Sequence, residues 1–84
     1  MARPRRTPEQ RADDSFRTEI RTRAAEINLT SQKAQADRAG MSQPTYSRRL
    51  QNPAEITVRE LRGIIQAMNP DPKVVLALLG ITGT

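Results

Sequence analysis

Side chains that can contact DNA bases are gathered in one short stretch, between Gln43 and Gln51. In the major groove of DNA, glutamine pairs bidentately with adenine, and arginine pairs with O6 and N7 of guanine. Gln43, Ser47 and Arg48 supply polar residue types of this kind, and no aspartate or glutamate lies among them to repel a phosphate. The stretch therefore indicates a surface that binds nucleic acid.

The residue types needed for most enzyme chemistry are missing. The chain contains no cysteine and no histidine, which removes thiol nucleophiles, the usual general base and the commonest metal ligands. Asp13, Asp14 and Asp71 are expected to act at helix N-termini rather than as a catalytic pair or a metal site. We therefore expect no enzymatic activity, no cofactor and no small-molecule substrate.

Apolar residues do not form a run long enough for a membrane span. The longest run, Val74 to Leu79, has six residues, whereas a membrane-spanning helix needs about 20. The basic residues at the N-terminus are followed by polar ones, unlike those of a secretory signal peptide. These features predict a cytoplasmic protein that does not associate with a membrane.

Positive charge is concentrated in the first half of the chain. The sequence has 14 lysine and arginine residues against 9 acidic ones, a formal net charge of +5, and 12 of the 14 are arginine. Residues 1–49 contain eleven basic and six acidic side chains, whereas residues 50–84 contain three of each. Arginine is a planar, bidentate donor suited to phosphate and guanine. The imbalance is compatible with an ordinary solvated surface, and it also fits a face that binds a polyanion.

Helical periodicity and capping signals predict five short helices and no strands. The 84 residues are enough for one domain. Helix starts are marked by capping boxes at Thr7–Gln10 and Thr57–Glu60 and by N-cap residues Ser31, Ser42 and Asp71. The predicted helices cover about residues 8–27, 32–39, 43–50, 58–68 and 72–79.

Apolar residues at helical spacing define the expected core. They are Phe16, Ile20, Ala24 and Ile27 in the first helix, Tyr46 and Leu50 in the third, Val58, Leu61, Ile64, Ile65 and Met68 in the fourth, and Val74, Val75, Leu78 and Leu79 in the last. The hydroxyl of Tyr46 is expected near the surface. Residues 8–80 form the expected domain, preceded by a disordered basic arm at 1–7 and followed by a C-terminal tail at 81–84.

The stretch from Ser31 to Leu50 has the physical features of a helix-turn-helix. Ala36 is small enough to let two helices cross closely, Gly40 can adopt the positive φ of the turn, and Met41 can anchor the turn in the core. The stretch resembles the helix-turn-helix of the Cro/CI, or lambda-repressor-like, family of DNA-binding proteins. The resemblance extends over about residues 15–80 and is carried by Ser31–Gln32, Ala36, Ala39–Gln43, Tyr46–Pro53 and Thr57–Leu61.

This resemblance implies a five-helix, all-α domain in which the second and third helices form the helix-turn-helix. The third helix, residues 43–50, is then the recognition helix that enters the major groove. The segment from Tyr46 to Leu61 is similar to small regulators encoded by phages and prophages. Three positions depart from the family pattern: aliphatic residues are usual where Gln35 and Arg49 stand, and Pro44 replaces a polar residue that reads DNA.

Site residues follow from the resemblance and from the outward face of the predicted helix 43–50. The residues expected to read bases are Gln43, Pro44, Ser47 and Arg48. Those expected to contact or orient phosphates are Gln32, Lys33, Arg38, Ser42, Arg49 and Asn52. Arg3, Arg5 and Arg6 could enter an adjacent minor groove, although a solubilising tail explains them equally well.

The expected function is that of a sequence-specific transcriptional regulator that binds double-stranded DNA, of the phage or prophage repressor or Cro-like type. Its expected partners are the duplex and a second copy of the chain, paired through the last helix and the C-terminal tail. A helix-turn-helix can also bind another protein instead of DNA. The alternative is therefore a protein-interaction module whose partner is an antirepressor, a polymerase or a toxin.

Overall fold

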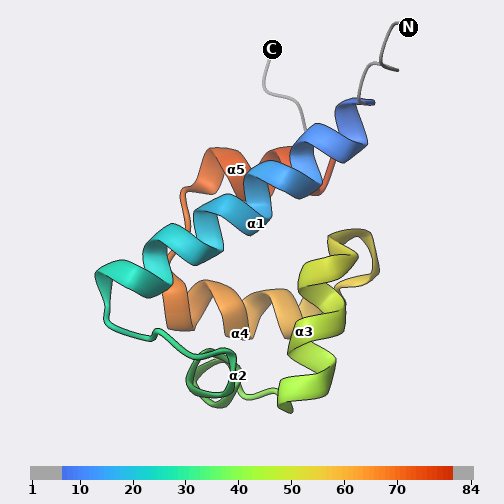
Figure 1. The fold of residues 1–84 in the computed structure, drawn as a ribbon. Coiled ribbons are helices and arrows are strands. Elements are labelled where there is room, and N and C mark those ends of the chain that lie inside the picture. Colours follow the sequence, from blue (N-terminus) through green and yellow to red (C-terminus); the bar gives the residue numbers. More distant parts are fainter. Residues whose placement is uncertain (1–6, 81–84) are drawn as a thin grey trace, which may run out of the picture.

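The computed structural model describes residues 7–80, and within that range it contains five α-helices, one 3₁₀ turn and no strand (Figure 1). The helices are α1 (Pro8–Glu26), α2 (Gln32–Ala39), α3 (Gln43–Gln51), α4 (Val58–Met68) and α5 (Pro72–Leu78), and the turn, η1, covers Pro53–Glu55. The prediction of an all-α chain with five helices is confirmed. The predicted ends differ by one residue each, at the C-termini of α1, α3 and α5.

The helix ends form where the sequence places its capping residues. In α4, the side chain of Thr57 accepts the N–H of Glu60 at 3.1 Å, and the Glu60 carboxylate accepts the N–H of Thr57 at 2.9 Å. This reciprocal pair satisfies two backbone donors that a helix start leaves open. α2 ends at Gly40, which has a left-handed φ of 74°. The N–H of Met41 then returns to the Ala36 carbonyl at 2.8 Å, which closes the helix and begins the turn toward α3.

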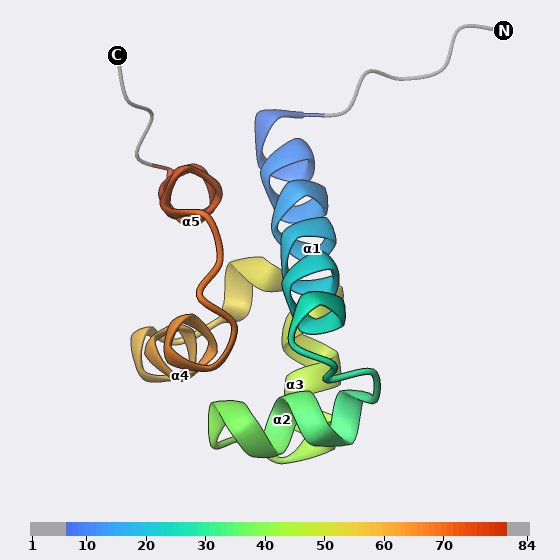
Figure 2. The ribbon, with the colours of Figure 1, turned by 90° about the vertical axis from the view of Figure 1, so that its left-hand side faces the viewer.

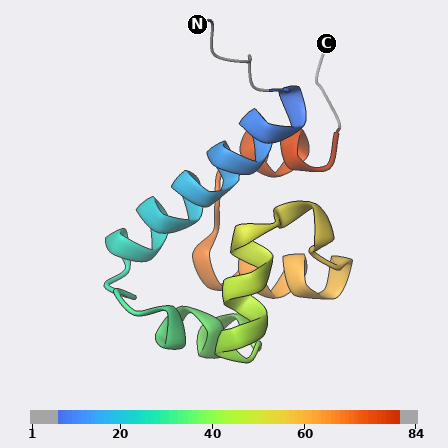
Figure 3. The same ribbon diagram turned by 45° about the vertical axis from the view of Figure 1, so that its right-hand side comes forward.

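The helices form two groups joined through α1. α1 and α5 pack side by side, while α2 packs on both α3 and α4 (Figures 1 and 2). Glu19 of α1 also holds the start of α5, because its carboxylate accepts the Asp71 N–H at 2.7 Å. Hydrogen bonds from Arg23 and from this N–H keep the pKa of Glu19 below its ordinary value. α3 lies on the outside of the molecule, with α2 adjoining its N-terminal end (Figure 3).

The core lies where these helices meet and is mostly the predicted one. Its buried side chains are Phe16, Ile20, Ala24, Ala36, Ala39, Tyr46, Leu61, Ile64, Met68 and Val75. Three predicted core residues are wrong: Ile27, Val58 and Leu79 are 42%, 64% and 53% exposed. Each lies at a helix end, where the periodic face continues but the neighbouring helix does not. A fourth predicted core residue, Ile65, is also wrong: it lies within α4 rather than at its end, and it is 37% exposed.

A buried polar link joins α2 to α3. The Tyr46 hydroxyl donates to Oε1 of Gln35 at 2.8 Å, and Nε2 of Gln35 donates to the Leu29 carbonyl at 2.9 Å. The prediction that this hydroxyl lies near the surface is therefore wrong, since Tyr46 is fully buried. Gln35 stands where the resembling family usually has an aliphatic residue, and its amide gives the buried phenol a partner. The link fixes the placement of α3 on α2.

We expect the protein to lose stability in alkaline solution because of Tyr46. Burial raises the pKa of this phenol from 10.0 to about 12. Above pH 10 the unfolded chain therefore releases a proton that the folded chain still holds, so the free energy of unfolding should fall between about pH 10 and 12. The whole loss is on the order of 2–3 kcal/mol, since one pKa unit corresponds to about 1.4 kcal/mol.

Urea unfolding across this pH range measures the effect, and tyrosinate absorbance assigns it because the chain has a single tyrosine. Tyr46→Phe is the control, since it keeps the ring and removes the titrating group. If the free energy of unfolding of Tyr46→Phe falls as steeply over this pH range as that of the wild type, other charged groups cause the loss of stability and Tyr46 does not.

Candidate nucleic-acid interface

α3 buries one side and leaves the opposite side open to solvent. Tyr46 is fully buried and Leu50 packs against the core, whereas Gln43, Pro44 and Arg48 are exposed. The helix starts at Ser42, whose hydroxyl accepts the Thr45 N–H at 3.4 Å and donates to the Thr45 side chain at 2.9 Å. The predicted inward and outward faces of this helix are thus confirmed. Ser42 itself serves the start of the helix.

The exposed side of α3 carries a positive charge that no carboxylate of the described chain neutralises. Arg48 forms no ion pair within residues 7–80, and the same holds for Lys33 and Arg38 on α2. All three side chains are exposed. A guanidinium without a carboxylate partner keeps its donors available to a phosphate or a guanine edge.

Arg49 differs from these residues because it is already paired. Its Nε donates to Glu60 at 2.9 Å, and its Nη1 lies 3.7 Å from a carboxylate oxygen of Glu55. Burial opposes ionisation of Glu60, but hydrogen bonds from Thr57 and Arg49 outweigh it and lower the pKa of this carboxyl. Arg49 therefore ties α3 to α4 and to η1. A phosphate would have to compete with two carboxylates for it.

Asn52 closes the C-terminal end of α3. Its N–H donates to the Arg48 carbonyl at 3.0 Å, and its own carbonyl accepts the Glu55 N–H at 3.0 Å. These bonds connect the recognition segment to the 3₁₀ turn, and the side chain of Asn52 is exposed. Arg49 and Asn52 thus both lie at the end of α3 opposite Gln43, and the structure does not gather them with the residues of its N-terminal half.

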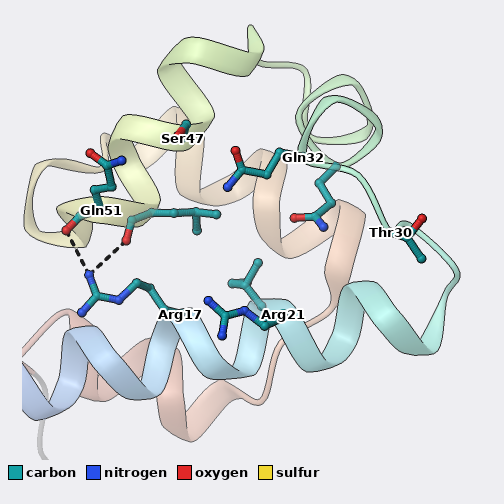
Figure 4. Close-up of a pocket in the computed structure, with 9 residues that line it drawn as sticks. Arg17, Arg21, Thr30, Gln32, Ser47 and Gln51 are labelled. Carbon is teal, nitrogen blue, oxygen red and sulfur yellow. Dashed lines mark hydrogen bonds between the residues drawn. The ribbon is translucent and has the colours of Figure 1, made fainter.

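An open cleft of about 480 Å³ lies between α1, α2 and α3 (Figure 4). Gln32 from the start of α2 and Ser47 from the middle of α3 both line it, so these two predicted residues share one site. Two arginines of α1 that were not among the predicted site residues, Arg17 and Arg21, also line the cleft. They are four residues apart and so share one face of α1, which is the signal that could have found them.

Arg17 holds the C-terminal end of α3 against α1. Its Nη1 donates to the Leu50 carbonyl at 3.3 Å and to the Gln51 carbonyl at 3.0 Å (Figure 4). Its Nη2 pairs with Asp14. A cation at the last carbonyls of a helix is stabilising because those oxygens have no partner within the helix. Arg17 is therefore a positioning residue for α3, contributed from 33 residues earlier in the chain.

The remaining predictions concern the two ends of the chain, metal binding and the membrane. Arg3, Arg5 and Arg6, with the predicted arm and tail at 1–6 and 81–84, lie outside the described residues. Within residues 7–80, no group of acidic side chains is placed to hold a metal ion. None of the helices in that range combines the length and the apolar character needed to cross a membrane.

Comparison of the chain with protein-family models, with curated proteins and with solved structures finds no match. The geometry of the site is therefore the basis for assigning it a function.

Proposed function

We propose that the protein is a sequence-specific transcriptional regulator of the Cro/CI type that binds double-stranded DNA. α2, the turn at Gly40 and α3 are its helix-turn-helix, and α3 enters the major groove. The observation that carries the proposal is the outward side of α3, which is exposed, has no acidic residue of its own and bears Arg48, an arginine without an ion pair within residues 7–80. The phage or prophage origin of the type belongs to the same proposal.

The proposed roles of the side chains in DNA binding follow from their positions. Gln43 and Arg48 read base edges from the exposed side of α3, since their side chains match adenine and guanine. Pro44 offers an apolar contact, and Ser47 lies at the cleft edge of the same helix. The phosphate contacts come from Lys33 and Arg38, which have no ion pair within the described residues, and from Gln32 at the start of α2, where backbone N–H groups favour an anion.

The proposed regulator binds DNA as a homodimer that pairs through α5. Beside this helix lies a groove of about 220 Å³ whose lining is mostly apolar: Ile65, Asn69, Pro70, Pro72, Val75 and Leu76. Leu76 in this lining is exposed, and so is Leu79 at the C-terminal end of the same helix. Contiguous exposed apolar surface marks interaction sites. A two-fold pair would present its α3 helices to half-sites about one helical turn apart.

Replacing Arg48 by alanine is expected to weaken binding to the preferred duplex by about 1–3 kcal/mol and to relax the preference at one base position. The reason is that a bidentate pair with guanine is lost while the fold keeps its core, because Arg48 is exposed. Fluorescence anisotropy with a labelled duplex and its single-base variants measures both quantities.

Arg62→Ala is the matched control for this experiment. Arg62 is an exposed arginine of α4 without an ion pair in the described chain, so its loss removes the same charge away from α3. Its variant should keep the base preference. An Arg48→Ala protein that retains both affinity and base preference would show that Arg48 does not read DNA.

A further inference from the structure

The cleft between α1, α2 and α3 has the composition of an anion site. It is lined by the guanidinium-bearing Arg17 and Arg21, by the polar residues Thr30, Gln32, Gln35, Ser47 and Gln51, and by Ile20 and Leu50. No carboxylate lines it. The cleft is open to solvent rather than enclosed, so it can admit a charged group that remains attached to a larger molecule.

The two arginines of the cleft differ in how many of their hydrogen-bond donors remain available to a ligand. Arg17 is occupied by Asp14 and by the carbonyls at the end of α3. Arg21 has no ion pair within the described chain, and its side chain, which runs along α1 toward Arg17, also lines the cleft (Figure 4). Arg21 is therefore the cation of the cleft whose donors are free for a ligand.

Neutral donors line the other sides of the cleft. The Gln32 amide and the Ser47 hydroxyl line the cleft from α2 and α3 (Figure 4). Gln32 is also the first residue of α2, so the positive end of the helix dipole lies at the edge of the cleft. A planar guanidinium with nearby hydroxyl and amide donors suits the several oxygens of a phosphate better than a single acceptor.

We infer that this cleft binds a phosphate group, with Arg21 as its charged partner and Gln32 and Ser47 as hydrogen-bond donors. The inference rests on the proposed function and deepens it, because a backbone phosphate of the duplex bound here adds α1 to the DNA interface. Ser47 then contacts the backbone, and base recognition is left to Gln43 and Arg48. A free phosphate ion has the same chemistry, so the experiment has one arm for each source.

The first arm uses duplex DNA and compares the wild type with Arg21→Gln and with Arg62→Gln, an exposed arginine of α4 outside the cleft. Loss of one phosphate contact in each copy of the dimer should reduce the slope of log K against log salt by about 0.9 per copy. Single methylphosphonate substitutions then identify the phosphate. We expect one position in each half-site where the substitution weakens the wild type and the Arg62→Gln variant but leaves Arg21→Gln unaffected, with the base preference unchanged in all three.

The second arm titrates the ¹⁵N-labelled protein with inorganic phosphate. Binding in the cleft should shift the resonances of Arg21 Nε, Gln32 and Ser47 in the wild type, and these shifts should disappear in Arg21→Gln. Circular dichroism checks that the variant keeps its helix content, which is expected because Arg21 is exposed.

The outcomes separate the two proposals. The expected methylphosphonate result supports a site in the cleft for a phosphate of the DNA backbone, whether or not free phosphate shifts the resonances. Shifts on free phosphate without duplex binding support the cleft with a free anion as the source and overturn the proposed function. If Arg21→Gln binds the duplex with the same salt slope and the same methylphosphonate pattern as the wild type, the phosphate site in the cleft is overturned. The proposed function then still stands. Failure of both arms overturns both.

Discussion

Raising the salt concentration from about 50 to about 200 mM is expected to weaken duplex binding by about 10³–10⁵-fold. On α1, α2 and α3, four exposed basic side chains near the proposed interface have no ion pair within residues 7–80: Arg21, Lys33, Arg38 and Arg48. Three of them, Arg21, Lys33 and Arg38, are assigned to phosphates, so a homodimer makes six such contacts. Six to ten phosphate contacts give a loss of about this size because the bound counterions are released.

Anisotropy titrations at a series of salt concentrations measure this slope. The charge-removing variant Arg38→Gln is the internal check, because it should lower the slope by about 0.9 in each copy while leaving base preference unchanged. A wild type whose affinity hardly depends on salt would contradict a phosphate-based interface, whatever the affinity itself.

Replacing Gly63 by alanine is expected to lower the free energy of unfolding by about 1–3 kcal/mol. α4 crosses α2 so closely at this residue that an added Cβ would lie 2.3 Å from the Ala39 carbonyl oxygen. The obstacle is backbone rather than a flexible side chain, so α2 and α4 must separate to admit the methyl group. Helix propensity alone gives the opposite sign, since alanine is better than glycine within a helix by about 1 kcal/mol.

Urea unfolding of Gly63→Ala beside Gln66→Ala tests this packing, because Gln66 is an exposed position of the same helix. The Gln66 variant should change stability by no more than about 0.5 kcal/mol. A Gly63→Ala protein more stable than the wild type would mean that propensity dominates and that the helices are not in this close contact.

The helix limits could be predicted from the sequence because they depend on local signals. Thr57 with Glu60 starts α4, and Gly40 ends α2, through bonds that reach only three to five residues along the chain. Periodicity also selected the buried side of α3 around Tyr46. It was wrong at Ile27 and Val58, because exposure at a helix end depends on where the next helix lies.

The parts of the candidate site that were missed depend on contacts between distant residues. Arg17 reaches the end of α3 across 33 positions, and Arg49 meets Glu60 across eleven. Arginines on an amphipathic helix look alike in the sequence, whether they face solvent, cap another helix or pair with a carboxylate. Only the positions of Glu55 in η1 and Glu60 in α4 distinguish Arg49, which is paired, from Arg48, which has no ion pair within residues 7–80.

The central claim, that the open side of α3 reads the major groove, is tested most directly by selecting bound duplexes from a random pool and sequencing them. We expect one enriched consensus with two related half-sites about one helical turn apart. The same selection with Arg48→Ala should lose the preference at one position of each half-site. Recovery of no consensus, with binding either absent or indifferent to sequence, would contradict the claim and favour a module that binds a protein.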